Sequence, residues 1–96
     1  MKRFFVYILA SRKNGTLYTG MTNDIARRAW EHRTGAVDGF TRRHSVKRLV
    51  YVEELATARD AIRREKTIKG WPRQWKINAI EQDNPEWFDL TRRLNR

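Results

Sequence analysis

Residues 4–10 form an uninterrupted apolar run, FFVYILA, which constrains the fold of this 96-residue chain more than any other feature. Its aromatic and β-branched side chains favour a strand, and the lack of alternation with polar residues predicts that both faces are covered. Asn14-Gly15 is a strong turn signal, and residues 16–21 predict a returning strand. We therefore expect an N-terminal antiparallel hairpin with further elements packed on both sides.

The remaining elements follow from periodicity and from helix end signals. A first helix should begin near residues 22–24, present Ile25, Ala29 and Trp30 on an apolar side and stop at Gly35, and a basic loop over 35–47 should lead to a third strand over 48–53. Three more segments are expected: a second helix from Thr57 to Lys69, a third over 72–82, and a short last helix that Asn84 caps and that ends at Leu90.

This element order predicts an α/β (α+β) fold, with a small three-stranded sheet flanked by three to four helices. The length fits a single domain over residues 1–96. The absence of cysteine and of an apolar signal-peptide segment suits a cytoplasmic location.

The charge balance indicates the class of partner. The chain has 21 Lys and Arg against 11 Asp and Glu, a formal net charge of +10. Such an excess predicts nucleic acid, because phosphates neutralised by Lys and Arg release counterions. A membrane partner is not expected, since no long helix opposes Lys and Arg to an aromatic face. The alternative is a basic protein without such a partner.

Two tyrosines are placed together by the hairpin. Side chains alternate along a strand, and a turn with an even number of residues brings Tyr7 and Tyr18 onto the same face, beside the small Gly20. Their separation depends on the register. The alternative to a functional pair is ordinary cross-strand aromatic packing.

The first helix contributes a cation and an imidazole as further candidate site residues. Arg28 and His32 are four residues apart and therefore neighbours on one helical face, at the border of the apolar side. A guanidinium in this place can reach a phosphate that lies on the sheet. The alternative is a solvated ion pair between Arg28 and Asp24.

The second helix carries a carboxylate within an apolar stripe. Glu65 lies seven residues after the start of a stripe made of Ala58, Ala61, Ile62 and Ile68. A carboxylate drawn out of water requires a compensating partner. That partner is an arginine in a buried ion pair, a buried hydroxyl or a divalent cation such as Mg²⁺.

These segments resemble a known family. Val6-Tyr7-Ile8 followed by Tyr18-Thr19-Gly20 is similar to the paired motif of the GIY-YIG nuclease superfamily, with Val6 in place of the first Gly and Thr19 in place of the second Ile. Residues 23–32 resemble its catalytic-arginine helix, and residues 64–71 its metal-binding glutamate helix. Residues 84–87 resemble the tail of small stand-alone bacterial members, the Uri-domain predicted endonucleases.

The resemblance implies an endonuclease that hydrolyses phosphodiester bonds in DNA with Mg²⁺ or Mn²⁺ as cofactor. Tyr7 would activate water, Tyr18 would position the reacting groups, and Arg28 would stabilise charge on the phosphate oxygens. Glu65 would hold the metal, and His32 would assist Tyr7 or hold the phosphate.

A family asparagine matches either Asn84 or Asn78, and Asn84 is also explained by helix capping. The basic loop adds a set of expected nucleic-acid contacts: Phe40, Arg42, Arg43 and Lys47. The alternative is a solvated charged loop, which also contains His44.

We expect cleavage guided by DNA structure, because the chain has little beyond the catalytic module for reading bases. A non-catalytic nucleic-acid binding module on the same fold is the alternative function. The oligomeric state does not follow from the sequence.

Overall fold

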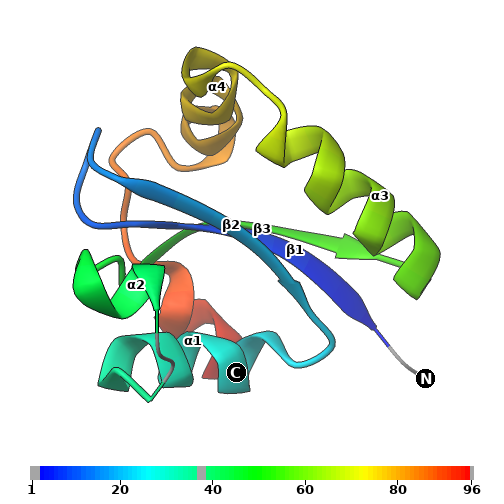
Figure 1. The fold of residues 1–96 in the computed structure, drawn as a ribbon, viewed down its shortest axis with the longest axis horizontal. Helices are drawn as coiled ribbons and strands as arrows, with labels where there is room; N and C mark the ends of the chain where they lie inside the picture. Colours follow the sequence, from blue (N-terminus) through cyan, green and yellow to red (C-terminus); the bar gives the residue numbers. More distant parts are fainter. Residues whose placement is uncertain (1–2, 37–38, 96) are drawn as a thin grey trace.

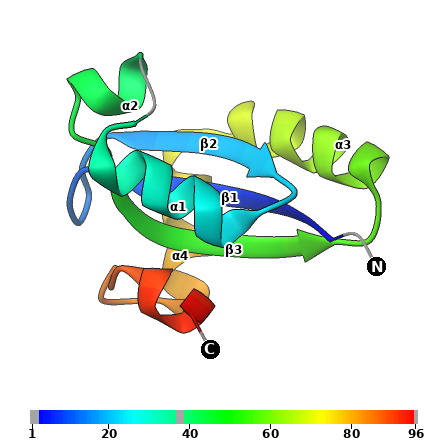
Figure 2. The same cartoon turned by 90° about the horizontal axis from the view of Figure 1, so that it is seen from below.

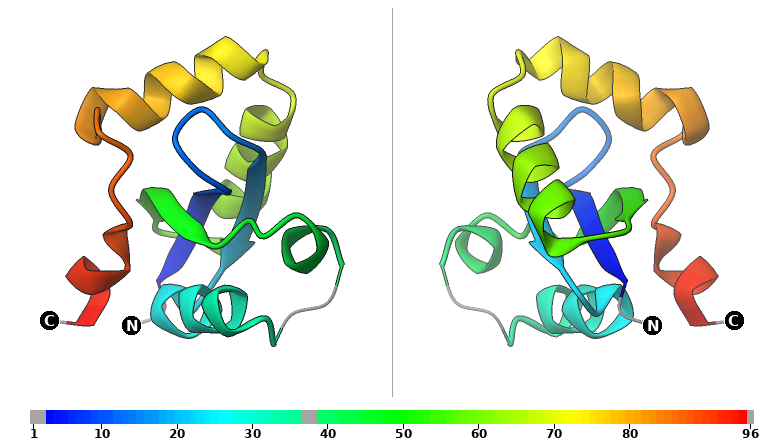
Figure 3. Two further views of the ribbon diagram at one scale, coloured as in Figure 1. Left: turned by 90° about the vertical axis from the view of Figure 1, so that its left-hand side faces the viewer. Right: turned by 90° about the vertical axis from the view of Figure 1, so that its right-hand side faces the viewer.

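The sheet forms the middle of three layers in the computed structural model, which describes residues 3–36 and 39–95 (Figure 1). The elements in chain order are β1 (Phe4–Ala10), β2 (Leu17–Thr22), α1 (Ile25–Thr34), α2 (Phe40–Arg43), β3 (Arg48–Leu55), α3 (Ala58–Lys69), α4 (Arg73–Asp83) and the 3₁₀ helix η1 (Leu90–Asn95). Helices α3 and α4 lie on one side of the sheet, and α1 and η1 lie on the other (Figures 1 and 3). The expected three-stranded sheet with flanking helices is confirmed.

Strand β1 is the centre of the sheet, whose order is β2-β1-β3. It pairs antiparallel with both neighbours, and Tyr7 lies opposite Gly20 while Leu9 lies opposite Tyr18. Tyr7 and Tyr18 therefore share a face, as predicted. This face packs against α1, whereas Val6 and Ile8 point to the opposite face and pack under α3 and α4.

Helices α1 and α3 begin and end at or next to the residues that the sequence predicted. The Asp24 side chain accepts a hydrogen bond from the Arg27 backbone at the start of α1, and Gly35 ends the helix with φ 74°. Thr57 caps α3 in the same way. No helix within residues 3–36 and 39–95 has the length and apolar character that a membrane crossing requires.

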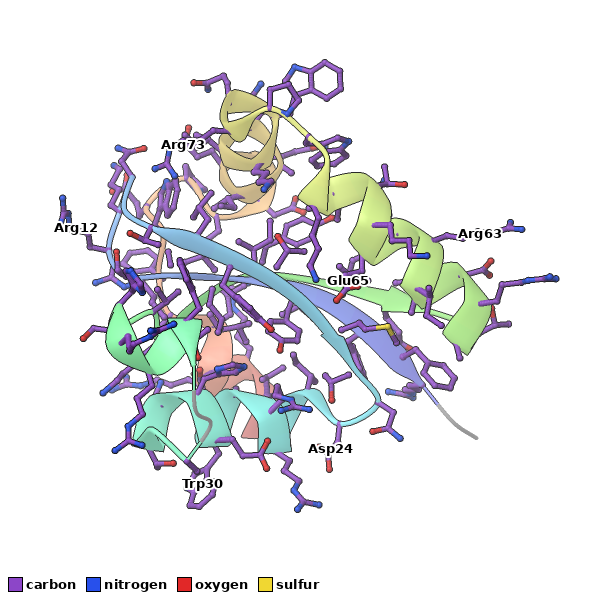
Figure 4. The ribbon with its side chains drawn as sticks, viewed as in Figure 1. Arg12, Asp24, Trp30, Arg63, Glu65 and Arg73 are labelled. Atoms are coloured by element: carbon purple, nitrogen blue, oxygen red, sulfur yellow. The ribbon has the colours of Figure 1, made fainter. Side chains whose placement is uncertain are left out.

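The apolar faces of these helices are narrower than periodicity predicted. Trp30 is 59% exposed and points away from the sheet (Figure 4), so it does not belong to the buried side of α1. On α3, Ala61 and Ile68 are buried while Ala58 and Ile62 are exposed. The line of buried α3 residues therefore runs through Ala61 and Ile68, with Glu65 between them.

The segment predicted as a basic loop contains a short helix. Within its described residues, α2 forms one helical turn beside the C-terminal end of α1 (Figure 2). Thr41 of this turn is buried although both of its neighbours are exposed. A single buried residue among exposed ones has no periodicity, which is why the sequence did not predict the helix.

The prediction of a last helix that begins at Asn84 is wrong. Asn84 follows α4 as its C-terminal cap, and its buried side chain donates hydrogen bonds to the backbone carbonyls of Val50 (3.2 Å) and Phe88 (2.9 Å). It also accepts one from the Phe88 backbone (2.9 Å), and Trp87 adopts a left-handed backbone with φ 60°. These contacts hold residues 84–88 in a turn against β3, so helical structure resumes only at Leu90.

We expect Asn84→Ala to lower the free energy of unfolding by about 2 kcal/mol, because it leaves buried backbone groups without partners. Asn78→Ala is the matched control, since exposed Asn78 bonds only to Gln74 on the same helix among its described contacts, and it should cost at most about 0.5 kcal/mol. Denaturant unfolding of both variants measures the difference. Equal stability of the two would contradict a structural role for Asn84.

Candidate active site

Tyr7 reaches across the hairpin and lies over Gly20 of the edge strand β2. A Cβ atom on Gly20 would stand 2.6 Å from the Tyr7 hydroxyl oxygen and 2.7 Å from its Cζ. It would also stand 3.1 Å from a ring carbon of Tyr18. Only glycine leaves room for this approach, so Gly20 fixes where the phenol of Tyr7 can lie.

Tyr7, Tyr18 and His32 form an aromatic cluster between the hairpin and α1. The His32 ring centroid lies 5.9 Å from that of Tyr7 and 5.7 Å from that of Tyr18, and the two tyrosine rings are 6.4 Å apart. The Tyr7 hydroxyl and His32 Nε2 are hydrogen-bonded at 3.2 Å in a buried position. The fold thus brings three of the predicted residues into direct contact.

The other ring nitrogen of His32 has a partner that the sequence did not indicate. His32 Nδ1 is hydrogen-bonded to Thr41 Oγ1 of α2 at 3.2 Å. Both residues are buried, and Thr41 is only 4% exposed. Their contact depends on how α2 packs against α1, which no local pattern in the sequence specifies.

The charged candidates act on the same phenol. Burial raises the pKa of Tyr7 above its ordinary value, and the neighbouring Tyr18 raises it further. The Arg28 charge lowers this pKa, whereas the carboxylates of Glu65 and Glu31 raise it. Burial prevails, so Tyr7 keeps its proton at neutral pH unless a proton acceptor and an added cation assist it.

His32 is suited to accept a proton. Burial lowers the pKa of His32, and the nearby Arg28 charge lowers it further, against a smaller opposing effect of Glu31. The imidazole is therefore neutral at pH 7 and has one unprotonated ring nitrogen.

Arg28 is the arginine of α1 whose charge lowers the pKa of both Tyr7 and His32. Its guanidinium pairs with Glu31 at 3.4 Å, in place of the Asp24 pair that spacing allowed. Arg27 pairs with the same carboxylate and is more exposed. Arg28 also lines a polar pocket of about 520 Å³, together with Thr22, Asn23, Asp24, Arg27 and Glu31.

Glu65 projects from α3 toward the strands, whereas Arg63 points outward (Figure 4). Its side chain is 19% exposed and pairs with the half-exposed Lys69 at 3.3 Å. A Glu–Arg ion pair was one alternative considered for Glu65. The arginine next to it in the chain, Arg64, pairs instead with Glu53 of β3 at 2.9 Å. Glu65 is thus paired with a half-exposed lysine rather than with an arginine.

This environment fits a hard divalent cation held by one carboxylate. No cluster of three or more His, Cys, Asp or Glu side chains suited to a metal ion occurs among residues 3–36 and 39–95. A cation at Glu65 would take its remaining ligands from water and from substrate phosphate, a combination that suits Mg²⁺.

The remaining predicted residues lie elsewhere. Asn84 packs against β3, at the opposite edge of the sheet from Gly20, and Asn78 is exposed on α4. Phe40 stacks on His44 with ring centroids 4.2 Å apart, so one face of its ring is covered. Three exposed cations continue from α2 toward β3: Arg42, Arg43 and Lys47.

Comparison with known proteins identifies the family of this chain. The GIY-YIG catalytic domain matches residues 3–78, which include the hairpin, α1 and α3. The chain therefore belongs to the GIY-YIG nuclease family, whose substrate is nucleic acid.

Within this family the chain is similar to UPF0213 proteins. One from Staphylococcus saprophyticus is 35% identical over 82 residues, which cover 85% of this chain and 99% of the relative. Another from Streptococcus agalactiae is 37% identical over 82 residues and is covered to 92% of its length. A UPF0213 protein of Bacillus halodurans, solved by NMR in solution, aligns with a TM-score of 0.56 and 30% identity over 93% of this chain and 94% of its own.

We expect Gly20→Ala to displace the Tyr7 ring and break its hydrogen bond to His32, with a stability cost of about 1–3 kcal/mol. Gly70→Ala is the control, since the nearest atoms to its Cβ would be backbone carbonyls at 3.6 Å. Nuclear Overhauser contacts between Tyr7 and His32 measure the effect. Their persistence in Gly20→Ala would contradict the packing described.

Proposed function

We propose that the protein is a metal-dependent endonuclease that hydrolyses phosphodiester bonds in DNA. The observation that carries the proposal is the buried hydrogen bond between Tyr7 and His32, with Arg28 and Glu65 acting on the same phenol. General-base chemistry needs such a group, a proton acceptor beside it and positive charge nearby.

Each residue then has a task in the reaction. Tyr7 accepts a proton from the attacking water as its own proton moves to the neutral His32. Arg28 binds the phosphate oxygens, on which negative charge builds in the transition state. Tyr18, packed on both Tyr7 and His32, keeps the two rings in place.

Glu65 would hold the cofactor, Mg²⁺ or Mn²⁺. When bound, the metal supplies Lewis-acid stabilisation of the phosphate and of the leaving oxygen. The Glu65 carboxylate is one of the charges that raise the pKa of Tyr7, so neutralising it favours loss of the phenolic proton.

The basic segment around α2 would bind the nucleic-acid backbone. Phe40, Arg42, Arg43 and Lys47 are exposed in or next to α2, the turn that contacts His32 through Thr41, and the three cations suit phosphates of any sequence. Cleavage guided by DNA structure agrees with this sequence-independent contact. We also propose that the protein acts in the cytoplasm. The alternative is a binding module without activity, which the same cations would also serve.

Purified protein incubated with branched, single-stranded and duplex DNA decides between these two functions. The samples contain Mg²⁺, Mn²⁺ or a chelator. Metal-dependent cleavage supports the nuclease, and binding without cleavage under every condition supports the binding module.

We expect Glu65→Gln to abolish cleavage and to leave DNA binding largely intact. Stability should change by less than about 1 kcal/mol, because Lys69, the partner of Glu65, is half exposed. Asp60→Asn, which removes an exposed carboxylate from the first turn of the same helix, is the matched control and should keep activity. Full cleavage by Glu65→Gln excludes the metal-ligand role.

We expect substitution of Arg42, Arg43 and Lys47 together by Ala to weaken binding to many DNA sequences about equally. The slope of log affinity against log salt should shrink by roughly three, about one per lost phosphate contact. Turnover at saturating substrate should stay nearly constant, since these contacts exist equally in the ground and transition states. A charge-conserving triple variant, with Lys at 42 and 43 and Arg at 47, should keep the slope.

Arg28→Ala should show the opposite behaviour, losing turnover while the slope changes by about one at most. Equal effects of Arg28→Ala and the triple Ala variant on turnover and slope would favour the binding module.

A further inference from the structure

We propose that Thr41 is a positioning residue that fixes the tautomer of His32, so that Nε2 is the ring nitrogen that accepts the Tyr7 proton. The proposal rests on the proposed nuclease function and deepens it. Its structural basis is the chain of two 3.2 Å hydrogen bonds that joins Thr41 Oγ1, the two ring nitrogens of His32 and the Tyr7 hydroxyl.

The chemistry of a neutral imidazole makes this assignment specific. One ring nitrogen carries a proton and the other carries a lone pair, so the two nitrogens have opposite roles. Tyr7 can donate its hydroxyl proton only to an unprotonated Nε2. In that tautomer Nδ1 carries the ring proton and donates a hydrogen bond to Thr41 Oγ1.

The surroundings of His32 show why a hydroxyl suits this position. The ring is faced by Tyr7 of β1, by Tyr18 of β2, and by Arg28 and Glu31 of its own helix. A carboxylate on Nδ1 would orient the ring but would also raise its basicity. The neutral Thr41 orients the ring and adds no charge, so the imidazole remains unprotonated and ready to accept.

The proton movements balance with this tautomer. Water forms the new bond to phosphorus as the bond to the leaving oxygen breaks. The proton of the water passes to the Tyr7 oxygen, and the original Tyr7 proton passes to His32 Nε2, which gives an imidazolium still bonded to Thr41 through Nδ1. The imidazolium then releases its Nε2 proton to solvent, and the leaving oxygen takes a proton from solvent.

The test compares Thr41→Val, which removes the hydroxyl at constant shape, with Thr41→Ser, which keeps it. Nitrogen-15 NMR of the ring nitrogens reports the tautomer directly, and exposed His44, the second of the two histidines in the chain, serves as an internal reference. The wild-type and Thr41→Ser proteins should show His32 with a protonated Nδ1 and a bare Nε2. Thr41→Val should show a mixture of tautomers.

Kinetics provide the second readout. In Thr41→Val, kcat should fall by about tenfold or more while KM changes little. Thr41→Ser should keep most of the wild-type kcat. Thr19→Val is the control for replacing a buried threonine, because within the described residues the Thr19 hydroxyl has no hydrogen-bond partner. It should keep both the rate and the His32 spectrum.

Two results would overturn the assignment. One is a wild-type His32 with a protonated Nε2, and the other is a Thr41→Val protein with an unchanged tautomer and kcat. Failure of the nuclease function is distinguishable, because a wild-type protein that cleaves no DNA refutes that function while the NMR spectra still test the Thr41 contact.

Discussion

The arrangement of the whole molecule depends on the double pairing of β1. This strand is hydrogen-bonded on both edges and covered on both faces, so the alternation of its side chains decides what each layer receives. Val6 and Ile8 anchor α3 and α4 on one side. Tyr7 and Leu9 anchor α1 on the other. A shift of one residue would exchange these sets, and the phenol of Tyr7 would then lie in the apolar core under α3.

The candidate site lies at the β2 edge of the sheet, between the helices that cover its two faces. Gly20 leaves the space over which Tyr7 extends to this edge, and α3 packs on the other side of the same strand. Charges from helices on opposite faces, Arg28 and Glu65, can therefore act on one hydroxyl. Neither helix needs an unusual conformation, because the absence of a side chain at Gly20 lets the Tyr7 hydroxyl reach the edge of the sheet.

Features set by local interactions could be predicted from the sequence. The Asn14-Gly15 turn, the caps at Asp24 and Thr57 and the apolar run of β1 depend on neighbours in the chain, and the structure agrees with them. The shared face of the two tyrosines followed from alternation and turn parity alone.

Features set by contacts distant in sequence could not be predicted. Asn84 was predicted to cap the start of a helix, but it ends α4, and its bond to the Val50 carbonyl, 34 residues away, holds the following turn against β3. The exposure of Trp30 and Ile62 depends on which neighbours cover them. Glu65 became a candidate through its position within an apolar stripe, but its ion pair with Lys69 was not predicted. Thr41 was not predicted, because its hydrogen bond to His32 forms only when α2 packs against α1.

The small size of α2 has a consequence for how activity depends on temperature. Four residues form a single turn, which has little helical stability of its own and depends on packing. Opening of this turn would release Thr41 from His32 while the hydrogen bonds of the sheet stay intact. The proposed activity would then fall in a local transition at a lower temperature than global unfolding, so a protein that is still folded by every spectroscopic measure of its sheet would already have lost much of it.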